Sequence, residues 1–414
     1  FTGMASQIIT IDNPDKPVEV LNGAEDKTQV LQEDGSEDPK KNADVSRPTT
    51  VMKGNEIYML VGKCSQTAVG PSKNDAEDCG LLLVKGEFSE ESNKRIKWSD
   101  ANAVPRASVG EPDSWTELIG SGGSGIKTDD GRLVFPVEGT KKEGEKTVSL
   151  IIHSLKDTNE GWKLSKGMSD GGCSDPSVVE WGEKDKKLMM MTACDDGRRR
   201  VYESSDMGDS WTEALGTLSR VWGNKQGEEV KAVRSGFITA TIDGDKRNVM
   251  LVTLPVYSKE DGNKEKSELH LWLTDNTHIV DIGPVSDDDA AASSLLYRSG
   301  KDGDNKEEEE LIALYEKRKK DDEETSHSLW SVRLAEQLQR VKEVLATWKK
   351  ADDIVSKLCP SSAAKGDASP EDVRRDFKIT DGLVGFLSGN FSENTWRDEY
   401  LGVDATVKNN EVWG

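Results

Sequence analysis

Short runs of β-type residues, each closed by a polar turn, recur through most of this 414-residue chain. Runs such as "EIYMLVGKC" and "NVMLVTLPVY" are rich in β-branched, aromatic and other apolar residues, and turn sequences such as "DDG" at 129–131 lie between them. The stretches with the most charge, 301–310 and 317–327, are best explained as solvated hairpin tips. The pattern therefore predicts an all-β fold.

One stretch, "SSDMGDSW" (204–211), directly follows a predicted strand and has relatives elsewhere in the chain. "HSLKDTNEGW" ends on Trp162, about fifty residues earlier, and "LWLTDNTHI" keeps a Thr-Asp-Asn core further on. A strand and hairpin repeated at this interval predict the blades of a β-propeller. We expect a structural role for the four key residues, which do not require a ligand: Ser204, Asp206, Gly208 and Trp211.

A single long segment has helical periodicity. Five apolar residues within 333–359 recur at intervals of three to four: Leu334, Leu338, Val341, Val344 and Leu345. We therefore divide the chain into a propeller (1–332), a connecting amphipathic helix (333–359) and a C-terminal part (360–414). That last part is expected to hold a linker, a returning propeller strand and the start of a connection to an absent domain.

The charge balance narrows the partners that this chain can bind. Its formal net charge is −22 and its hydrophobic fraction is 34%, which argues against nucleic acid and against docking on an anionic membrane. No signal peptide and no apolar run long enough to cross a membrane are present. The opening "FTGMASQIIT" already alternates like a strand, so we expect that this chain was cut from a larger protein.

The sequence predicts no metal and no cofactor. The five cysteines form no CxxC pair, the four histidines lack ligand spacing, and "GSGGSG" (120–125) lacks the lysine of a phosphate-binding loop. That loop is expected to be a flexible connection between strands.

The cysteines suggest disulfides instead. A hairpin around "GEKDKK" would bring Cys173 opposite Cys194, and Cys64 with Cys79 is a weaker second pair. The alternative is buried free thiols in a reducing compartment. A glycosylation sequon at Asn390 also fits a secreted protein.

Four segments, "CSDPSVVEW", "RRRVYESSDMGDSWTEALGTLSRVWGN", "LHLWLTDN" and "LVGFLS", resemble the sialidase propeller of the trypanosome trans-sialidase superfamily. The likeness extends from about Asp44 to the C-terminus. The likeness is greater to the gp85 surface-glycoprotein branch of that superfamily than to its active enzymes. The resemblance implies a six-bladed propeller with an incomplete N-terminal blade, then a helix and a lectin-like β-sandwich. We expect the sandwich and the family's lipid-anchor signal to be absent from this chain.

The resemblance also implies a chemistry that can be checked position by position. Sialidases bind a carboxylate with arginines and attack with a tyrosine that a glutamate activates, while an aspartate serves as general acid. The tyrosine position holds Ala292, and the activating glutamate is replaced by Asp175. Two arginine positions hold Ala193 and Lys266. The remaining arginine and the general acid would lie upstream of Phe1.

Three further pocket positions follow from the same resemblance. Arg47 replaces an aspartate, Lys264 falls where a tryptophan clamps the acceptor sugar, and Glu316 matches a pocket glutamate. The run 198–200 holds three arginines that would alternate between faces of a strand. We interpret them as propeller-surface and ion-pair residues, with an anionic ligand patch as the alternative.

These substitutions predict a vestigial pocket with no catalytic residues, because losing a nucleophile commonly costs several orders of magnitude in rate. Our leading hypothesis is a catalytically inactive, lipid-anchored adhesin on a parasite surface. It would bind host-cell or extracellular-matrix proteins, or glycans, during attachment and invasion. The alternatives are a sialidase or trans-sialidase with a displaced nucleophile, and a complement-binding or immune-decoy protein.

Overall fold

The computed structural model describes most of the chain from residue 43 to residue 358, with shorter segments on either side. The described residues are 5–6, 16–20, 29–30, 43–65, 78–88, 96–99, 102–104, 115–142, 144, 146–156, 161–182, 184–242, 247–259, 265–299, 301–302, 305–306, 309–320, 325–358, 387–392, 395–398 and 405–406.

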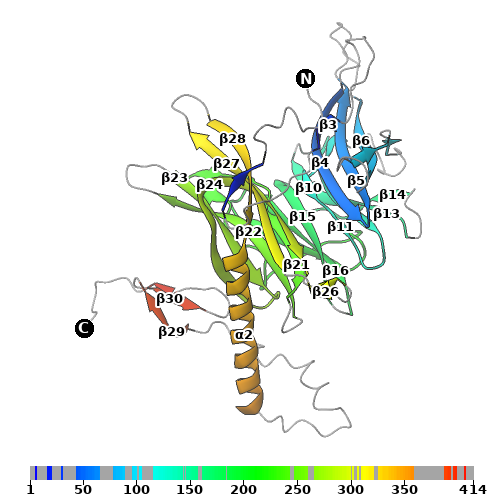
Figure 1. Cartoon of the computed structure of the whole chain (residues 1–414). Coiled ribbons are helices and arrows are strands. Elements are labelled where there is room, and N and C mark those ends of the chain that lie inside the picture. Colours follow the sequence, from blue (N-terminus) through cyan, green and yellow to red (C-terminus); the bar gives the residue numbers. More distant parts are fainter. Residues whose placement is uncertain are drawn as a thin grey trace, which may run out of the picture.

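Most described strands belong to five units of four antiparallel strands, which we call blades and name after their first strand (Figure 1). The β4 blade contains β4 (Ala43–Lys53), β5 (Glu56–Ser65), β6 (Asp78–Phe88) and β7 (Ile96–Trp98). The β11 blade contains β11 (Ile126–Lys127), β12 (Leu133–Lys141), β13 (Thr147–Ser154) and β14 (Trp162–Leu164). The β15 blade contains β15 (Cys173–Trp181), β16 (Lys187–Cys194), β17 (Arg199–Ser204) and β18 (Thr212–Glu213).

The last two blades share one long strand, β24 (Ile279–Arg298). Its first half completes the β21 blade with β21 (Gly236–Thr241), β22 (Asn248–Lys259) and β23 (Glu265–Thr274). Its second half begins the β24 blade, which continues with β27 (Glu310–Lys320), β28 (Thr325–Arg333) and β2 (Val18–Glu19). The final blade thus takes its outer strand from the N-terminal part of the chain.

The smaller strands connect or extend these blades. The β9 strand (Trp115–Gly120) pairs with β12, β8 (Asn102–Ala103) pairs with β6, and β10 (Gly123–Ser124) pairs in parallel with β4. Three short pairs stand apart: β1 (Ala5–Ser6) with β3 (Gln29–Val30), β19 (Lys225–Gln226) with β20 (Glu229–Val230), and β25 (Lys301–Asp302) with β26 (Asn305–Lys306).

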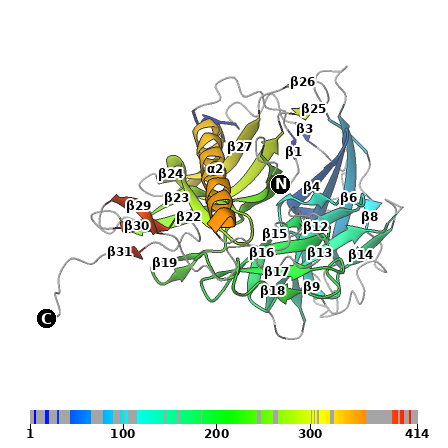
Figure 2. The same ribbon diagram turned by 90° about the horizontal axis from the view of Figure 1, so that it is seen from below.

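The first strands of successive blades contact one another, from β4 to β11, then β15, β21 and β24. They are therefore the innermost strands, and the blades radiate from them (Figure 2). This is a β-propeller, as the sequence predicted. Five blades are described, and of the N-terminal blade that was expected to be incomplete only the β1–β3 pair lies among the described residues.

The middle strands are buried on both faces because neighbouring blades cover both sides. Met189, Met190 and Met191 of β16 are all buried. Met190 packs with the β11 blade, beside Ile151, whereas Met189 and Met191 pack with the β21 blade, beside Val252. Such strands appear in the sequence as continuous apolar runs without alternation.

The helix predicted over 333–359 is present as α2 (Ala335–Leu358), and its apolar stripe is buried against the β21 and β24 blades. Trp348 of α2 stacks on His278, with 4.7 Å between the ring centroids. Arg247 pairs with Asp352 of α2 at 2.7 Å. The helix lies on the lower side of the molecule and extends away from the sheets (Figure 1).

The C-terminal strands form a sheet of their own, consisting of β29 (Leu387–Ser392), β30 (Thr395–Asp398) and β31 (Ala405–Thr406). Most of the segment that was expected to return as a propeller strand lies outside the described residues, and β29 pairs with β30. The side chain of Asn390 lies outside the described part, so its glycosylation stays a prediction.

The predicted disulfide between Cys173 and Cys194 is present, and it joins register partners on β15 and β16. Cys64 and Cys79 are likewise register partners on β5 and β6, but their side chains lie outside the described part. A bond between them remains a prediction. Cys359 also lies outside the described residues.

The "SSDMGDSW" stretch forms the turn between β17 and β18 and carries its own hydrogen bonds. Ser204 Oγ donates to Asp206 Oδ1 at 2.8 Å and accepts from the Gly208 N–H at 2.7 Å. Asp206 also accepts from the Ser210 N–H at 2.9 Å. Trp211 packs at the junction of the β11 and β15 blades. The turn thus stabilises the contact between two blades, as expected from the sequence.

Gly208 offers a direct test of that structural role. Its φ is +82° and a Cβ there would lie 2.8 Å from Ser165 Cβ. Gly208→Ala should therefore combine backbone strain of about 1 kcal/mol with overpacking of about 1–3 kcal/mol. We expect a clear loss in the free energy of unfolding, measured by urea denaturation.

Gly216 provides the matched control, since its φ is also +82° but nothing lies within 4 Å of the position of its Cβ. Gly216→Ala should lose the strain contribution alone. Equal losses in the two variants would show that the turn does not hold the blades together.

Candidate functional site

Three innermost strands are interrupted by β-bulges, and each bulge carries a position singled out in the sequence. The register shifts between Ser46 and Thr49 in β4, between Ser174 and Ser177 in β15, and between Ala290 and Ser293 in β24. These segments contain Arg47, Asp175 and Ala292. Bulges near functional sites re-aim side chains. Arg47 and Asp175 have φ values of +48° and +52°, which non-glycine residues adopt rarely.

A buried carboxylate, Glu138 of β12, holds the first two bulges together. Its Oε1 pairs with Arg47 Nη1 and accepts the Asp175 N–H at 2.9 Å. The Arg47 guanidinium also lies 3.9 Å from Asp175 Oδ1. The Glu138 side chain is only 7% exposed, whereas that of Arg47 is 41% exposed. Arg47 therefore covers the two carboxylates from the solvent side.

Arg234 connects this cluster to the third bulge. Its Nη1 donates to Ser121 Oγ at 2.5 Å and its Nη2 donates to the Ser124 carbonyl at 3.2 Å. Its own carbonyl accepts the Ser293 N–H at 3.1 Å, next to Ala292. A Cβ at Gly123 would lie 2.2 Å from Arg234 Nε. The glycine-rich segment 120–125 is thus packed around a guanidinium.

Burial shifts the pKa values of two groups in this cluster, Glu138 and Arg234. Burial, reinforced by the Asp175 charge, raises the pKa of Glu138 to about 7 despite the opposing effect of Arg47. Burial lowers the pKa of the Arg234 guanidinium to about 10, although Asp175 and Glu138 oppose that change. The cluster is formally neutral when both carboxyls are ionised and gains one positive charge when Glu138 binds a proton.

A second buried guanidinium lies behind Ala193. Ala193 of β16 pairs in register with Arg199 of β17, which is fully buried and donates to the Val233 carbonyl at 3.0 Å. Its Nε and Nη1 have no hydrogen-bond partner in the described part of the chain, nor has the buried Tyr257 hydroxyl. Burial lowers the pKa of Arg199 to about 10.

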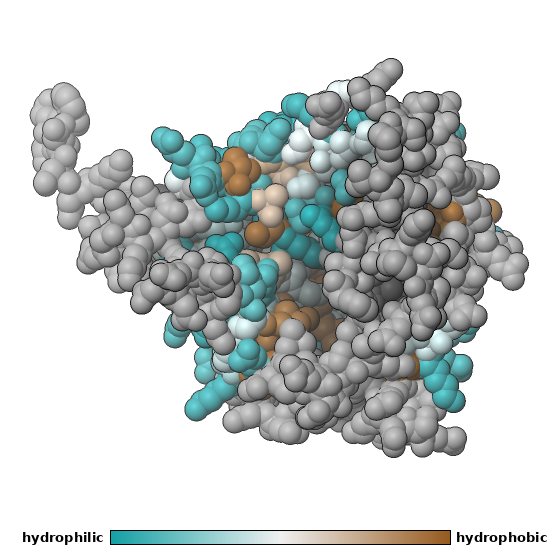
Figure 3. All heavy atoms as spheres, turned by 90° about the horizontal axis from the view of Figure 1, so that it is seen from above, coloured by the Kyte–Doolittle hydropathy of each residue, from teal (hydrophilic) through white to brown (hydrophobic). Residues whose placement is uncertain are grey.

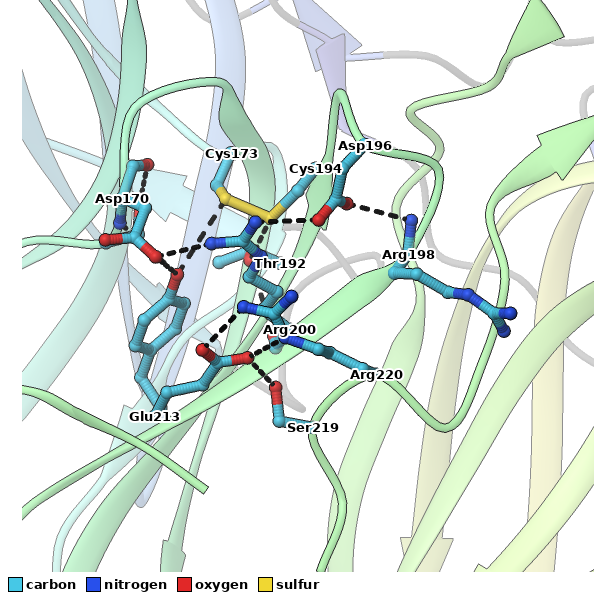
Figure 4. Close-up of polar contacts among 12 residues, drawn as sticks. Asp170, Cys173, Thr192, Cys194, Asp196, Arg198, Arg200, Glu213, Ser219 and Arg220 are labelled. Atoms are coloured by element: carbon cyan, nitrogen blue, oxygen red, sulfur yellow. Dashed lines mark hydrogen bonds and ion pairs between the residues drawn. A yellow bond between two sulfur atoms is a disulfide. The ribbon is translucent and has the colours of Figure 1, made fainter. Parts of the chain in front are cut away.

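The expectation that residues 198–200 are surface and ion-pair residues is therefore wrong for Arg199, because the neighbouring blade covers that face of β17. It holds for Arg200, whose guanidinium pairs with Asp170 and, at 2.7 Å, with Asp196. Figure 4 shows Arg200 between these two carboxylates and the Arg198 side chain directed away from them.

Figure 3 shows the molecule from above, with hydrophilic and hydrophobic residues side by side near the centre of this face. No group of three or more His, Cys, Asp or Glu side chains in the described part of the chain could hold a metal ion. The cluster therefore contains guanidinium and carboxylate groups. Position 292, in the third bulge, holds an alanine and no hydroxyl group.

Two family models match this chain, one over the propeller and one over the C-terminal residues. The model of a BNR repeat-like domain matches residues 3–316, and that of the trans-sialidase C-terminal domain matches residues 379–413. A Trypanosoma cruzi protein named Sialidase 85-1.1 is 35% identical over 385 residues, which cover 91% of this chain and 46% of that protein. A second T. cruzi protein, named Sialidase, is 38% identical over 247 residues, or 58% of this chain and 20% of that protein.

Among solved structures, Trypanosoma rangeli sialidase in complex with 2,3-difluorosialic acid, described as a covalent intermediate, is 34% identical with a TM-score of 0.70. The match covers 93% of this chain and 58% of that one. The chain belongs to the trans-sialidase superfamily. It spans less than half of the curated T. cruzi relatives.

For this trans-sialidase superfamily member, the structure places two of the sequence-selected positions in contact, since Arg47 Nη1 lies 3.9 Å from Asp175 Oδ1. Ala193 is the register partner of Ser174, next to Asp175, and Ala292 precedes Ser293, whose N–H donates to the Arg234 carbonyl. The other two described positions have partners of their own. Lys266 Nζ lies 3.2 Å from Glu268, and Glu316 pairs with His327 at 2.8 Å. Lys264 lies outside the described residues.

Sequence reasoning missed Glu138 and Arg234, which hold the cluster together. Glu138 left one signal, since "VFPVEGT" places a carboxylate inside an otherwise apolar strand, where an unpaired charge would be costly. Arg234 lies in a loop of ordinary composition and left none.

Glu138 predicts a pH dependence of stability. Between pH 4.5 and about 7 the folded protein keeps a proton on this carboxyl that the unfolded chain has released. Stability should therefore fall as pH rises through this window, by up to about 3 kcal/mol, and level off above it. Glu138→Gln keeps the acceptor oxygen but cannot titrate, so its stability relative to the wild type should increase over the same window.

Thermal unfolding of the wild type and of Glu138→Gln, measured between pH 4 and 8 in steps of about one pH unit, would reveal this difference. Glu117→Gln is the control, since Glu117 is exposed on β9. A wild-type curve parallel to that of Glu138→Gln would contradict the prediction.

Proposed function

We propose that this chain is the propeller part of a non-catalytic surface adhesin that binds host-cell or extracellular-matrix ligands. The observation that carries the proposal is Ala292. The T. rangeli sialidase is described as forming a covalent intermediate with its ligand, which requires a nucleophile on the enzyme. The family resemblance places that nucleophile at position 292, where a methyl group has no electron pair to attack with.

The charges of the cluster also support loss of catalysis. The carboxylates of Glu138 and Asp175 are engaged by Arg47, and Arg234 donates to Ser121 and Ser124. A ligand carboxylate would need bidentate guanidinium donors that are free to reach it. At position 193 the resemblance expects such an arginine, and the structure has a methyl group with a fully buried Arg199 behind it.

An extracellular location fits the Cys173–Cys194 disulfide, because such bonds persist in oxidising compartments. In the described part of the chain, no helix is both long and apolar enough to cross a membrane. Attachment to the cell surface through a lipid anchor belongs to this proposal and concerns the whole protein.

Hydrolysis of a fluorogenic sialoside tests the loss of catalysis. We expect no turnover above the buffer background from this chain, with T. rangeli sialidase as the positive control. Ala292→Tyr should remain inactive as well, because Ala193 lacks the guanidinium and Asp175 stays paired with Arg47. Turnover by the unaltered chain within about tenfold of the control would show that it is an enzyme.

Binding to cultured host cells and to laminin-coated surfaces tests adhesion. We expect saturable binding of the labelled chain that free sialic acid does not reduce. Chain that has been heat-unfolded is the control for non-specific attachment. Binding no greater than that control, to both cells and laminin, would rule out adhesion by this propeller.

A further inference from the structure

A cavity of about 270 Å³ lies at the opposite end of the innermost strands from the charged cluster. Asp175 lies near the start of β15, and Trp181 at its end lines the cavity. Arg234 precedes β21, and Thr241 at the end of that strand lines the cavity. Three blades thus meet around an opening that neither the superfamily comparison nor the proposed function accounts for.

The lining combines hydrogen-bonding groups of every kind with one large aromatic residue. It comprises Ile126, Lys127, Asp129, Glu180, Trp181, Gly182, Lys186, Thr239, Ala240, Thr241 and Asn248. Two ammonium groups and two carboxylates balance in charge. The remaining polar groups are two hydroxyls and an amide. Such a balanced lining selects against strongly charged ligands and favours a neutral one that can both donate and accept hydrogen bonds.

Several of the polar groups already have partners within the protein. Glu180 accepts the Asp129 N–H at 2.9 Å, and Lys186 pairs with Asp129. On the other wall, Thr241 donates to the Asn248 side-chain oxygen at 2.5 Å. The residue before Asn248, Arg247, is anchored to Asp352 of α2. Held side chains lose little conformational entropy on binding, which favours affinity for a small ligand.

Size and chemistry together define the ligand class. A cavity of this volume falls just below the range of drug-sized sites, of about 300–1,000 Å³, so it suits a single ring better than a chain. Trp181 is half-buried against the core between the β15 and β21 blades and supplies an apolar wall. A sugar ring has an apolar face and a rim of hydroxyls that matches these surroundings.

We propose that this cavity, at the end of the innermost strands opposite the charged cluster, binds a neutral monosaccharide unit. The site is separate from the charged cluster around Asp175 and does not depend on residue 292. It is also distinct from the adhesion proposal, because that proposal assigns no role to this cavity.

Saturation-transfer NMR on the full chain tests the proposal, with galactose, glucose, mannose and N-acetylglucosamine as neutral probes and N-acetylneuraminic acid as the anionic probe. Thr239→Arg fills the mouth from an exposed position, so the fold should survive, whereas truncating Trp181 would disturb the core. Thr212→Arg, an identical change at an exposed position on the outer strand β18, is the matched control.

We expect at least one neutral probe to bind, and Thr239→Arg to weaken it by at least about tenfold while Thr212→Arg leaves it unchanged. The proposal is overturned if no neutral probe binds, if the two variants behave alike, or if only the anionic probe binds. None of these outcomes depends on sialoside turnover or cell attachment, so this proposal can fail without affecting the previous one.

Discussion

The packing of one blade face against the next is the constraint on which this structure depends. A four-stranded sheet has two faces, and here the middle strands are buried on both, as the three methionines of β16 show. No blade can bury its apolar residues alone, so each is stable only beside its neighbours. The few polar groups inside the middle strands are buried, as Glu138 of β12 shows, and such groups need partners.

The inner strands show how such a scaffold carries polar chemistry. Where β4, β15 and β24 bulge, their side chains are released from strict alternation. The left-handed backbone at Arg47 and Asp175 is unfavourable in isolation and is held by bonds to Glu138. The buried carboxylate is thus tolerated because it satisfies two strained segments together, at the cost of a pKa raised to about 7.

The sequence predicted those features that depend on residues close together in the chain, and it missed those that depend on residues far apart. The turn at Ser204, the Cys173–Cys194 pair and α2 depend on residues close in sequence, and all three are present in the structure. Glu138 and Arg47 are separated by 91 positions, and Arg234 and Ser121 by 113. Neither contact leaves a local pattern. Arg199 was misjudged for the same reason, because only the neighbouring blade decides which face of β17 is buried.

The two ends of the innermost strands therefore carry different sets of polar groups. At the end that carries the bulges, Arg47 pairs with Glu138, which also accepts the Asp175 N–H. At the other end of these strands, three blades line a cavity with equal numbers of lysines and carboxylates, and several of its polar groups already have hydrogen-bond partners. Because inter-blade packing fixes the strands between them, either end can change its side chains without moving the other. One set of strands can thus carry different side-chain chemistry at its two ends.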